Sequence, residues 1–113
     1  MKFLNPDITA SQNLALDPLS YTTSIGRKFR LEKIIFHAGA GITETITITH
    51  ISKQGSSYNN VMRIKSLNSE TDYIFTPDGE NFFLDGDEIK IECTNATAVT
   101  TINAIIKTSE ISV

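Results

Sequence analysis

Apolar and polar residues alternate most regularly between residues 29 and 51, in two runs joined by a glycine-rich segment. In the second run the isoleucines from 42 to 48 share one parity and the threonines from 43 to 49 share the other. Successive side chains of a strand point to opposite faces, so this run predicts a half-buried strand. The first run becomes apolar on both parities at Ile34, Ile35 and Phe36, which indicates a central strand or one that carries a bulge.

The rest of the chain repeats this pattern in short pieces separated by turn residues. Strands are expected near residues 60–67, 72–76 and 82–84, with two last strands on either side of a loop at 95–98. About eight short strands with frequent turns predict a sandwich or barrel. We expect an all-β fold, a single antiparallel β-sandwich that resembles a jelly roll. Jelly-roll and immunoglobulin-like strand orders stay open, because both use the same alternation.

Local patterns also predict details within this sandwich. Met62 and Ile64 fall on one parity of their strand and Arg63 and Lys65 on the other. Residues 77–80, Pro-Asp-Gly-Glu, have the composition of a tight turn.

Two strand pairings follow if neighbouring strands form hairpins. A bend at residues 38–41 pairs the runs of the 29–51 stretch and places His50 near Arg30. The loop at 95–98 sets Ile91 against Ile102 and Ile89 against Ala104. This second register joins core positions to core positions, whereas a slip by one residue does not.

Residues 1–20 differ from the rest, because prolines interrupt them and their apolar residues show no sustained period. We expect an extended N-terminal arm, with a short strand at 14–16 or at 21–24, followed by a sandwich domain at 21–113. The arm is expected to contact a neighbouring molecule. The proposed contact residues are Phe3, Leu4, Ile8, Leu14, Leu16 and Tyr21.

Composition excludes several classes of partner. The chain has 113 residues and a formal net charge of −3, so it lacks the basic surface that nucleic acid requires. It also lacks a polybasic segment, an apolar signal sequence and a run long enough to cross a membrane. Synthesis in a cytoplasm is expected. The single cysteine, Cys93, shares its parity with Ile89 and Ile91 and is expected to be buried.

The candidate chemical groups do not form a recognised site. His37 and His50 would lie roughly 20 Å apart in the predicted hairpin, at about 3.3 Å per residue, which is too far to share a metal ion. The acidic turns 78–80 and 85–87 could offer oxygens to Ca²⁺, but their spacing matches no established calcium loop. Turn formation explains them equally well, so calcium binding is left open. We expect no metal and no other cofactor.

No nucleophile with an evident base appears, and no glycine loop that would hold phosphate. A non-enzymatic protein is therefore expected. Tyr21, Tyr58 and Tyr73 are candidates for a sugar-stacking platform or, equally, for core or interface positions. Residues 95–97, Asn-Ala-Thr, match the glycosylation pattern, and without secretion they indicate a polar turn.

Three segments are considered together: residues 26–34 (GRKFRLEKI), 44–48 (ETITI) and 83–89 (FLDGDEI). In combination they resemble small β-sandwich structural proteins of tailed-bacteriophage virions, which decorate or cement a capsid or attach fibres and tails. The last of them is also similar to the final hairpin of jelly rolls of the C1q and tumour-necrosis-factor type, many of which are trimers.

The resemblance implies a virion structural protein, most simply a capsid decoration, cement or head-fibre module. Such a protein would form a homotrimer or another homo-oligomer and would bind the major capsid protein or another virion protein. The alternative is a carbohydrate-binding or receptor-binding module of a phage tail or fibre.

Overall fold

The computed structural model describes residues 4–77 and 82–111 and confirms an all-β fold. Among these residues the ordered elements are nine strands and one short 3-10 turn, η1, at Ser56–Tyr58. The strands are β1 (Ile8–Asn13), β2 (Leu19–Thr23), β3 (Phe29–Ile42), β4 (Thr45–Ile51), β5 (Asn60–Ser66), β6 (Glu70–Phe75), β7 (Phe82–Phe83), β8 (Glu88–Cys93) and β9 (Thr101–Glu110). In the described part of the chain, no helix is long and apolar enough to cross a membrane.

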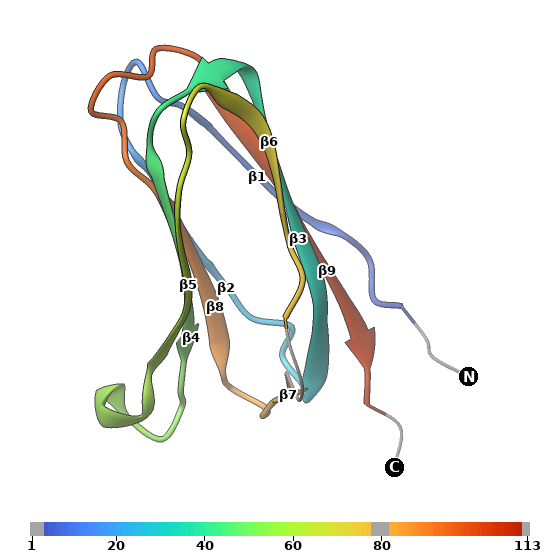
Figure 1. Cartoon of the computed structure of the whole chain (residues 1–113). Coiled ribbons are helices and arrows are strands. Elements are labelled where there is room, and N and C mark those ends of the chain that lie inside the picture. Colours follow the sequence, from blue (N-terminus) through green and yellow to red (C-terminus); the bar gives the residue numbers. More distant parts are fainter. Residues whose placement is uncertain (1–3, 78–81, 112–113) are drawn as a thin grey trace.

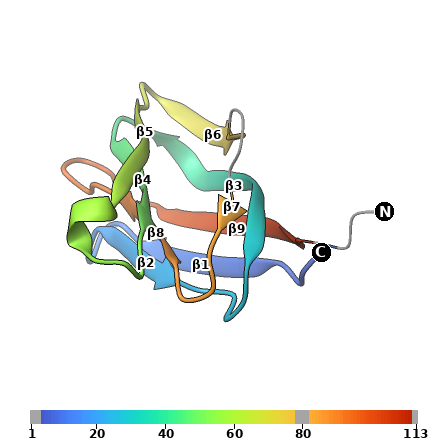
Figure 2. The same cartoon turned by 90° about the horizontal axis from the view of Figure 1, so that it is seen from below.

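The strands form two antiparallel sheets that face each other (Figure 1). Sheet 1 has the order β1-β9-β3-β6, with the short β7 also paired to β3, and sheet 2 has the order β2-β8-β4-β5. Seen from below, the two layers enclose a common interior, and β7 lies near the end of β3 (Figure 2). With β7 set aside, this is the strand order of an eight-stranded jelly roll. The antiparallel sandwich expected from the sequence is therefore confirmed.

The core lies between the sheets and is made by the alternate residues of each strand. Ile46 and Ile48 of β4 and Ile34 and Phe36 of β3 are almost completely buried, with exposed fractions of 0 to 1%. Burial of an isoleucine or phenylalanine side chain contributes roughly 1.5–3 kcal/mol relative to exposure. The half-buried threonine strand predicted from the alternation is therefore confirmed.

The predicted hairpin between the two runs of residues 29–51 is wrong. β3 continues through the glycine segment to Ile42, and the following run forms β4 in the other sheet. β3 is a central strand with two register shifts, as its apolar residues on both faces indicated. Gly39 and Gly41 allow neighbouring segments to approach β3 closely. A Cβ on Gly41 would lie 3.0 Å from the Ser69 carbonyl oxygen, and one on Gly39 would lie 2.7 Å from the Thr100 hydroxyl.

The predicted pairing of the last two strands is also wrong. β8 pairs with β2 and β4 in sheet 2, whereas β9 lies between β1 and β3 in sheet 1. Ile91 and Ile102 are both buried, yet they belong to opposite sheets. The alternation shows only which side chains point inward. It does not show whether the strand that faces them is a neighbour in the same sheet or lies in the other sheet, across the core.

The predicted boundary at residue 20 does not separate an arm from the sandwich. Residues 8–13 form β1, an edge strand of sheet 1 that pairs with β9 along its whole length. Asn5 is buried and its side chain donates a hydrogen bond of 3.0 Å to the Thr108 hydroxyl. The strand expected at 21–24 corresponds to β2, whereas residues 14–16 form no strand.

The proposed contact residues of the arm divide into three groups. Leu14 is 1% exposed and belongs to the core, so it cannot contact a neighbour. Ile8 and Tyr21 are partly buried against the same core. Leu4 and Leu16 are exposed, and Phe3 lies outside the described residues.

The two parities of β5 do not separate into an inner and an outer face. Met62 packs against the core, whereas Arg63 and Lys65 lie opposite the inward residues of β4. A register shift lies between Ile48 and Thr49 of β4, at the point where the two strands pair. The cationic groups of Arg63 and Lys65 then lie 5.9 Å from the ring centres of Phe75 and Tyr73. Ile64 points outward and is 64% exposed. Inward-pointing charges on an edge strand discourage pairing with another chain. The turn expected at 77–80 lies largely outside the described residues.

Candidate functional site

The two histidines make separate pairs with aspartates on different sheets. His37 of β3 lies opposite Asp72 of β6, and its Nδ1 is 2.6 Å from the aspartate Oδ1. Both side chains are exposed. The hydrogen bond to His37, with a further one from Thr71, holds the pKa of Asp72 below its usual value. The pair therefore places a persistent carboxylate on the outer face of sheet 1.

His50 lies near the end of β4 and contacts two residues of the segment 83–87. Its Nε2 lies 2.8 Å from Oδ2 of Asp87, and its ring stacks on Phe83 with centroids 3.9 Å apart. The backbone amides of Lys53 and Leu84 donate hydrogen bonds of 2.9 Å to the same carboxylate. Burial alone would raise the pKa of Asp87, but these hydrogen bonds outweigh it and lower that pKa. The acidic turn at 85–87 thus uses its buried carboxylate to hold loops together.

Glu44 is a second buried carboxylate, 4% exposed, and it organises the loop between β8 and β9. Burial opposes its ionisation, but the Thr94 hydroxyl and the backbone amides of Thr97, Ala98 and Ala96 lower the pKa of Glu44 to about 2. These four donors lie 2.7 to 3.0 Å from its oxygens. The Asn-Ala-Thr segment is therefore a polar loop closed around an anion. Sequence reasoning missed this role, because the loop follows Glu44 by about fifty residues.

Among the residues that the structure describes, the candidate metal-binding and sugar-stacking side chains do not come together. Within residues 4–77 and 82–111, no group of three His, Cys, Asp or Glu side chains could hold a metal ion. Asp78 and Glu80 of the proposed calcium turns lie outside those residues. Tyr21 and Tyr73 pack inward on different sheets, and Tyr58 is exposed on η1, so the three tyrosines form no common platform.

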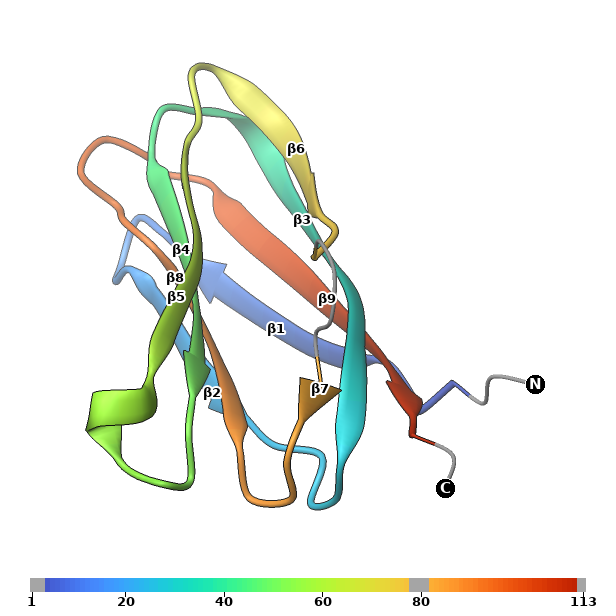
Figure 3. The ribbon, with the colours of Figure 1, turned by 60° about the horizontal axis from the view of Figure 1, so that its bottom comes forward.

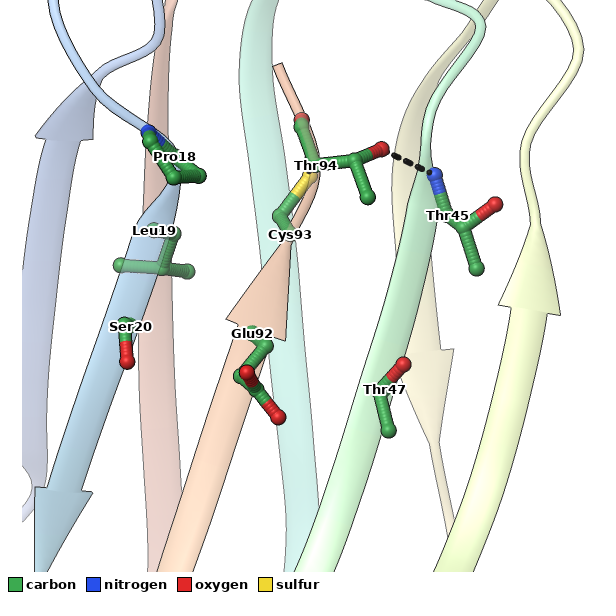
Figure 4. Close-up of a pocket in the computed structure, with 8 residues that line it drawn as sticks. All are labelled: Pro18, Leu19, Ser20, Thr45, Thr47, Glu92, Cys93 and Thr94. Carbon is green, nitrogen blue, oxygen red and sulfur yellow. Dashed lines mark hydrogen bonds between the residues drawn. The ribbon is translucent and has the colours of Figure 1, made fainter. Parts of the chain in front are cut away.

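A shallow pocket of 160 Å³ lies on the outer face of sheet 2 (Figure 4). Figure 4 shows Ser20, Glu92 and Thr47 on three neighbouring strands, and the register places them in one row. The volume is well below the roughly 300–1,000 Å³ of ordinary small-molecule sites. Cys93, at the edge of this pocket, is 1% exposed, which confirms the predicted burial. Burial and the nearby Glu44 carboxylate raise the pKa of its thiol to about 11.

The outer face of sheet 1 carries an apolar row that crosses three strands. Ile105, Ile35 and Ile74 lie opposite one another on β9, β3 and β6 and form a row across three strands. We call these three residues the isoleucine row. All three point away from the core: Ile74 is 56% exposed and the other two are partly exposed. The corresponding central rows of sheet 2 carry Ser20, Thr22, Thr47, Thr49, Lys90 and Glu92.

Charged groups flank the isoleucine row on both sides, at the next outward positions of the same strands. On one side Lys33 of β3 lies directly opposite Lys107 of β9. On the other side lies the pair of His37 and Asp72. Figure 3 shows the three strands that carry the row, with β6 at the edge of sheet 1. The row could be suspected from Ile35 alone, but its two partners depend on strand pairings between distant segments.

The fold and this surface define the class: a jelly-roll β-sandwich in which exposed apolar residues form a row across three strands of sheet 1 and lie on the edge strand β5 of sheet 2. Neither a scan against models of protein families nor a search of curated proteins found a match. Among solved structures the chain is similar to the Drosophila NLP core, whose crystal structure was described for pentamer formation and histone binding. The TM-score is 0.48 and the identity 11%, over 90% of this chain and 96% of that one.

The expected function as a capsid decoration, cement or head-fibre protein is contradicted by the comparisons. The similar solved structure is not a virion protein, and no family or curated relative connects the chain to a phage. Two of the three motifs on which that expectation rested have a local structural role: residues 83–89 contain the turn that holds Asp87, and Glu44 closes the loop at 94–98. The phage assignment, with its tail or fibre alternative, is therefore abandoned.

Proposed function

We propose that this protein is a non-enzymatic module that self-associates through the outer face of sheet 1. The isoleucine row is the observation that carries the proposal. Three isoleucines in register form a continuous apolar strip across β9, β3 and β6, with Lys33, Lys107 and the His37–Asp72 pair in the rows beside it. Contiguous exposed apolar surface bordered by polar residues is typical of protein interaction sites.

The buried ionisable groups support a structural role rather than catalysis. The oxygens of Glu44 and Asp87 are occupied by hydrogen bonds from backbone amides and from neighbouring side chains. Both pKa values are lowered, so these groups remain ionised near neutral pH and are unsuited to accept protons there. The two carboxylates hold the neighbouring loops in place.

The chain supplies a matched pair of variants for testing the face. Ile74 of β6 and Ile64 of β5 are isoleucines on edge strands of opposite sheets, 56% and 64% exposed. Threonine keeps the β-branched shape that suits a strand but removes apolar surface. Sedimentation velocity over a concentration series would compare wild type, Ile74→Thr and Ile64→Thr, with circular dichroism to verify folding.

We expect the wild type to show a concentration-dependent increase in mass. Ile74→Thr should weaken association by roughly fivefold or more, since covering an isoleucine contributes of order 1 kcal/mol or more. Ile64→Thr should leave it unchanged. A wild type that stays monomeric at all concentrations would contradict self-association. Weakening by Ile64→Thr alone would contradict the choice of sheet 1.

A further inference from the structure

We propose that two copies stack these faces about a two-fold axis running along the isoleucine row, so that Lys33 of each copy faces the His37–Asp72 pair of the other. This arrangement rests on the proposed self-association. It specifies the partner as a second copy of the chain and gives the contacts that would orient it.

The charge distribution selects this axis. Lysines lie on one side of the row and the Asp72 carboxylate on the other. A two-fold axis across the strands exchanges the two sides, so each lysine side meets an acidic side. An axis along the strands would instead place lysines over lysines. Like charges brought together at an interface disfavour association, whereas complementary charges fix the register of the partners.

The lysine side carries an unfavourable arrangement within a single chain, which an anionic partner would relieve. Lys33 and Lys107 are direct neighbours across β3 and β9, and like charges directly opposite in a sheet are destabilising. The Lys107 ammonium is bound by Asp7, at 2.9 Å. In the proposed stack, Asp72 of a second copy would supply a carboxylate to Lys33.

The Asp72 side of the isoleucine row is accessible for such a contact. The Asp72 carboxylate is 2.6 Å from His37 and remains 65% exposed. The other charged groups on this face and its border are Asp7, Arg30, Glu32, Glu70 and Lys107. Glu32 accepts a hydrogen bond of 2.6 Å from Ser109, and Arg30 lies over the ring of Phe82 at 4.7 Å, so both are held near the far end of the face.

Charge-reversal variants test the arrangement directly. In Lys33→Glu each copy would place glutamate against Asp72, and in Asp72→Lys each copy would place lysine against Lys33. Two symmetric contacts become repulsive in either variant, so we expect association weakened roughly tenfold or more at low ionic strength. Mixing the two variants makes both contacts attractive again, and so does the double variant.

The experiment combines sedimentation velocity with native mass spectrometry of each variant, of their equimolar mixture and of the double variant. We expect mainly monomers for each single variant, and heterodimers for the mixture. Single variants that associate as the wild type does, or a mixture that fails to recover, would overturn the arrangement. If Ile74→Thr still weakens association in that case, the proposed face stands and only the stacking geometry fails. A monomeric wild type would overturn both.

Discussion

Replacing Glu44 with glutamine is expected to destabilise the fold in a pH-dependent manner. The substitution keeps the size of the side chain but removes the negative charge around which residues 94–98 close. The Thr94 hydroxyl and three backbone amides then lose an ionised acceptor. Hydrogen bonds to charged groups are stronger than those between neutral groups. Replacing one carboxylate oxygen by an amide nitrogen should therefore cost much stability for so small a change.

The size of the effect follows from the pKa of Glu44. A tenfold change in an acid constant corresponds to about 1.4 kcal/mol, so the lowering from 4.5 to about 2 corresponds to about 3 kcal/mol. Ala96 and Thr97 are exposed, and water can partly replace the lost bonds. We therefore expect Glu44→Gln to lower the free energy of unfolding by about 1.5 to about 3 kcal/mol at pH 7.

The pH dependence has a defined direction. The folded-state pKa of Glu44 lies below its unfolded value, so the contribution is complete above about pH 5 and disappears as the pH falls toward 2. Urea denaturation at pH 7, 4 and 2.5 would measure the difference between wild type and variant. The difference should shrink steadily over this series, because the wild type loses the contribution that the variant never had.

A matched control is Glu92→Gln on β8, whose carboxylate is exposed and 3.8 Å from the Lys90 ammonium. Exposed ion pairs contribute about 0 to 1 kcal/mol, so this variant should differ little from wild type. Equal effects of the two substitutions at pH 7 would refute the reasoning. So would a difference between wild type and Glu44→Gln that persists unchanged at pH 2.5.

Two further predictions concern buried groups. Cys93 should react with a thiol reagent at pH 8 only as fast as the protein unfolds, since it is 1% exposed and its thiol pKa is about 11; rapid labelling of native protein, followed by mass spectrometry, would contradict this. Asp87→Asn should lower stability by about 1–3 kcal/mol at pH 7, because the Lys53 and Leu84 amides lose a charged acceptor. The folded-state pKa of Asp87 is lowered, so this difference should also diminish as the pH falls below 4; denaturant midpoints measure both.

The local alternation of apolar and polar residues predicted much of the strand content. Alternation around Ile46 and Ile48 identified β4, and apolar residues on both parities near Ile34 identified β3 as a central strand. Both conclusions depend on the period-two geometry of a strand, which is a local property. The burial of Cys93 followed from the same geometry.

Pairing partners could not be obtained in this way. Most connections between the described strands cross from one sheet to the other, and among these strands only β4 and β5 are successive and paired with each other. Inward residues such as Ile91 and Ile102 have the same parity relation across the core as within a hairpin. The alternation therefore did not decide which strands pair with each other, and the register depends on that pairing.

The candidate surface shows the same division between local and distant information. The sequence by itself determined that this protein is built of alternating strands, that Ile35 lies in a strand that is apolar on both faces, and that a strand is expected at 72–76. Only the tertiary structure decided that Ile105, Ile35 and Ile74 are neighbours, that Asp72 meets His37, and that Glu44 closes a loop fifty residues away. These relations arise from strand order and close packing, which depend on contacts between segments far apart in the chain.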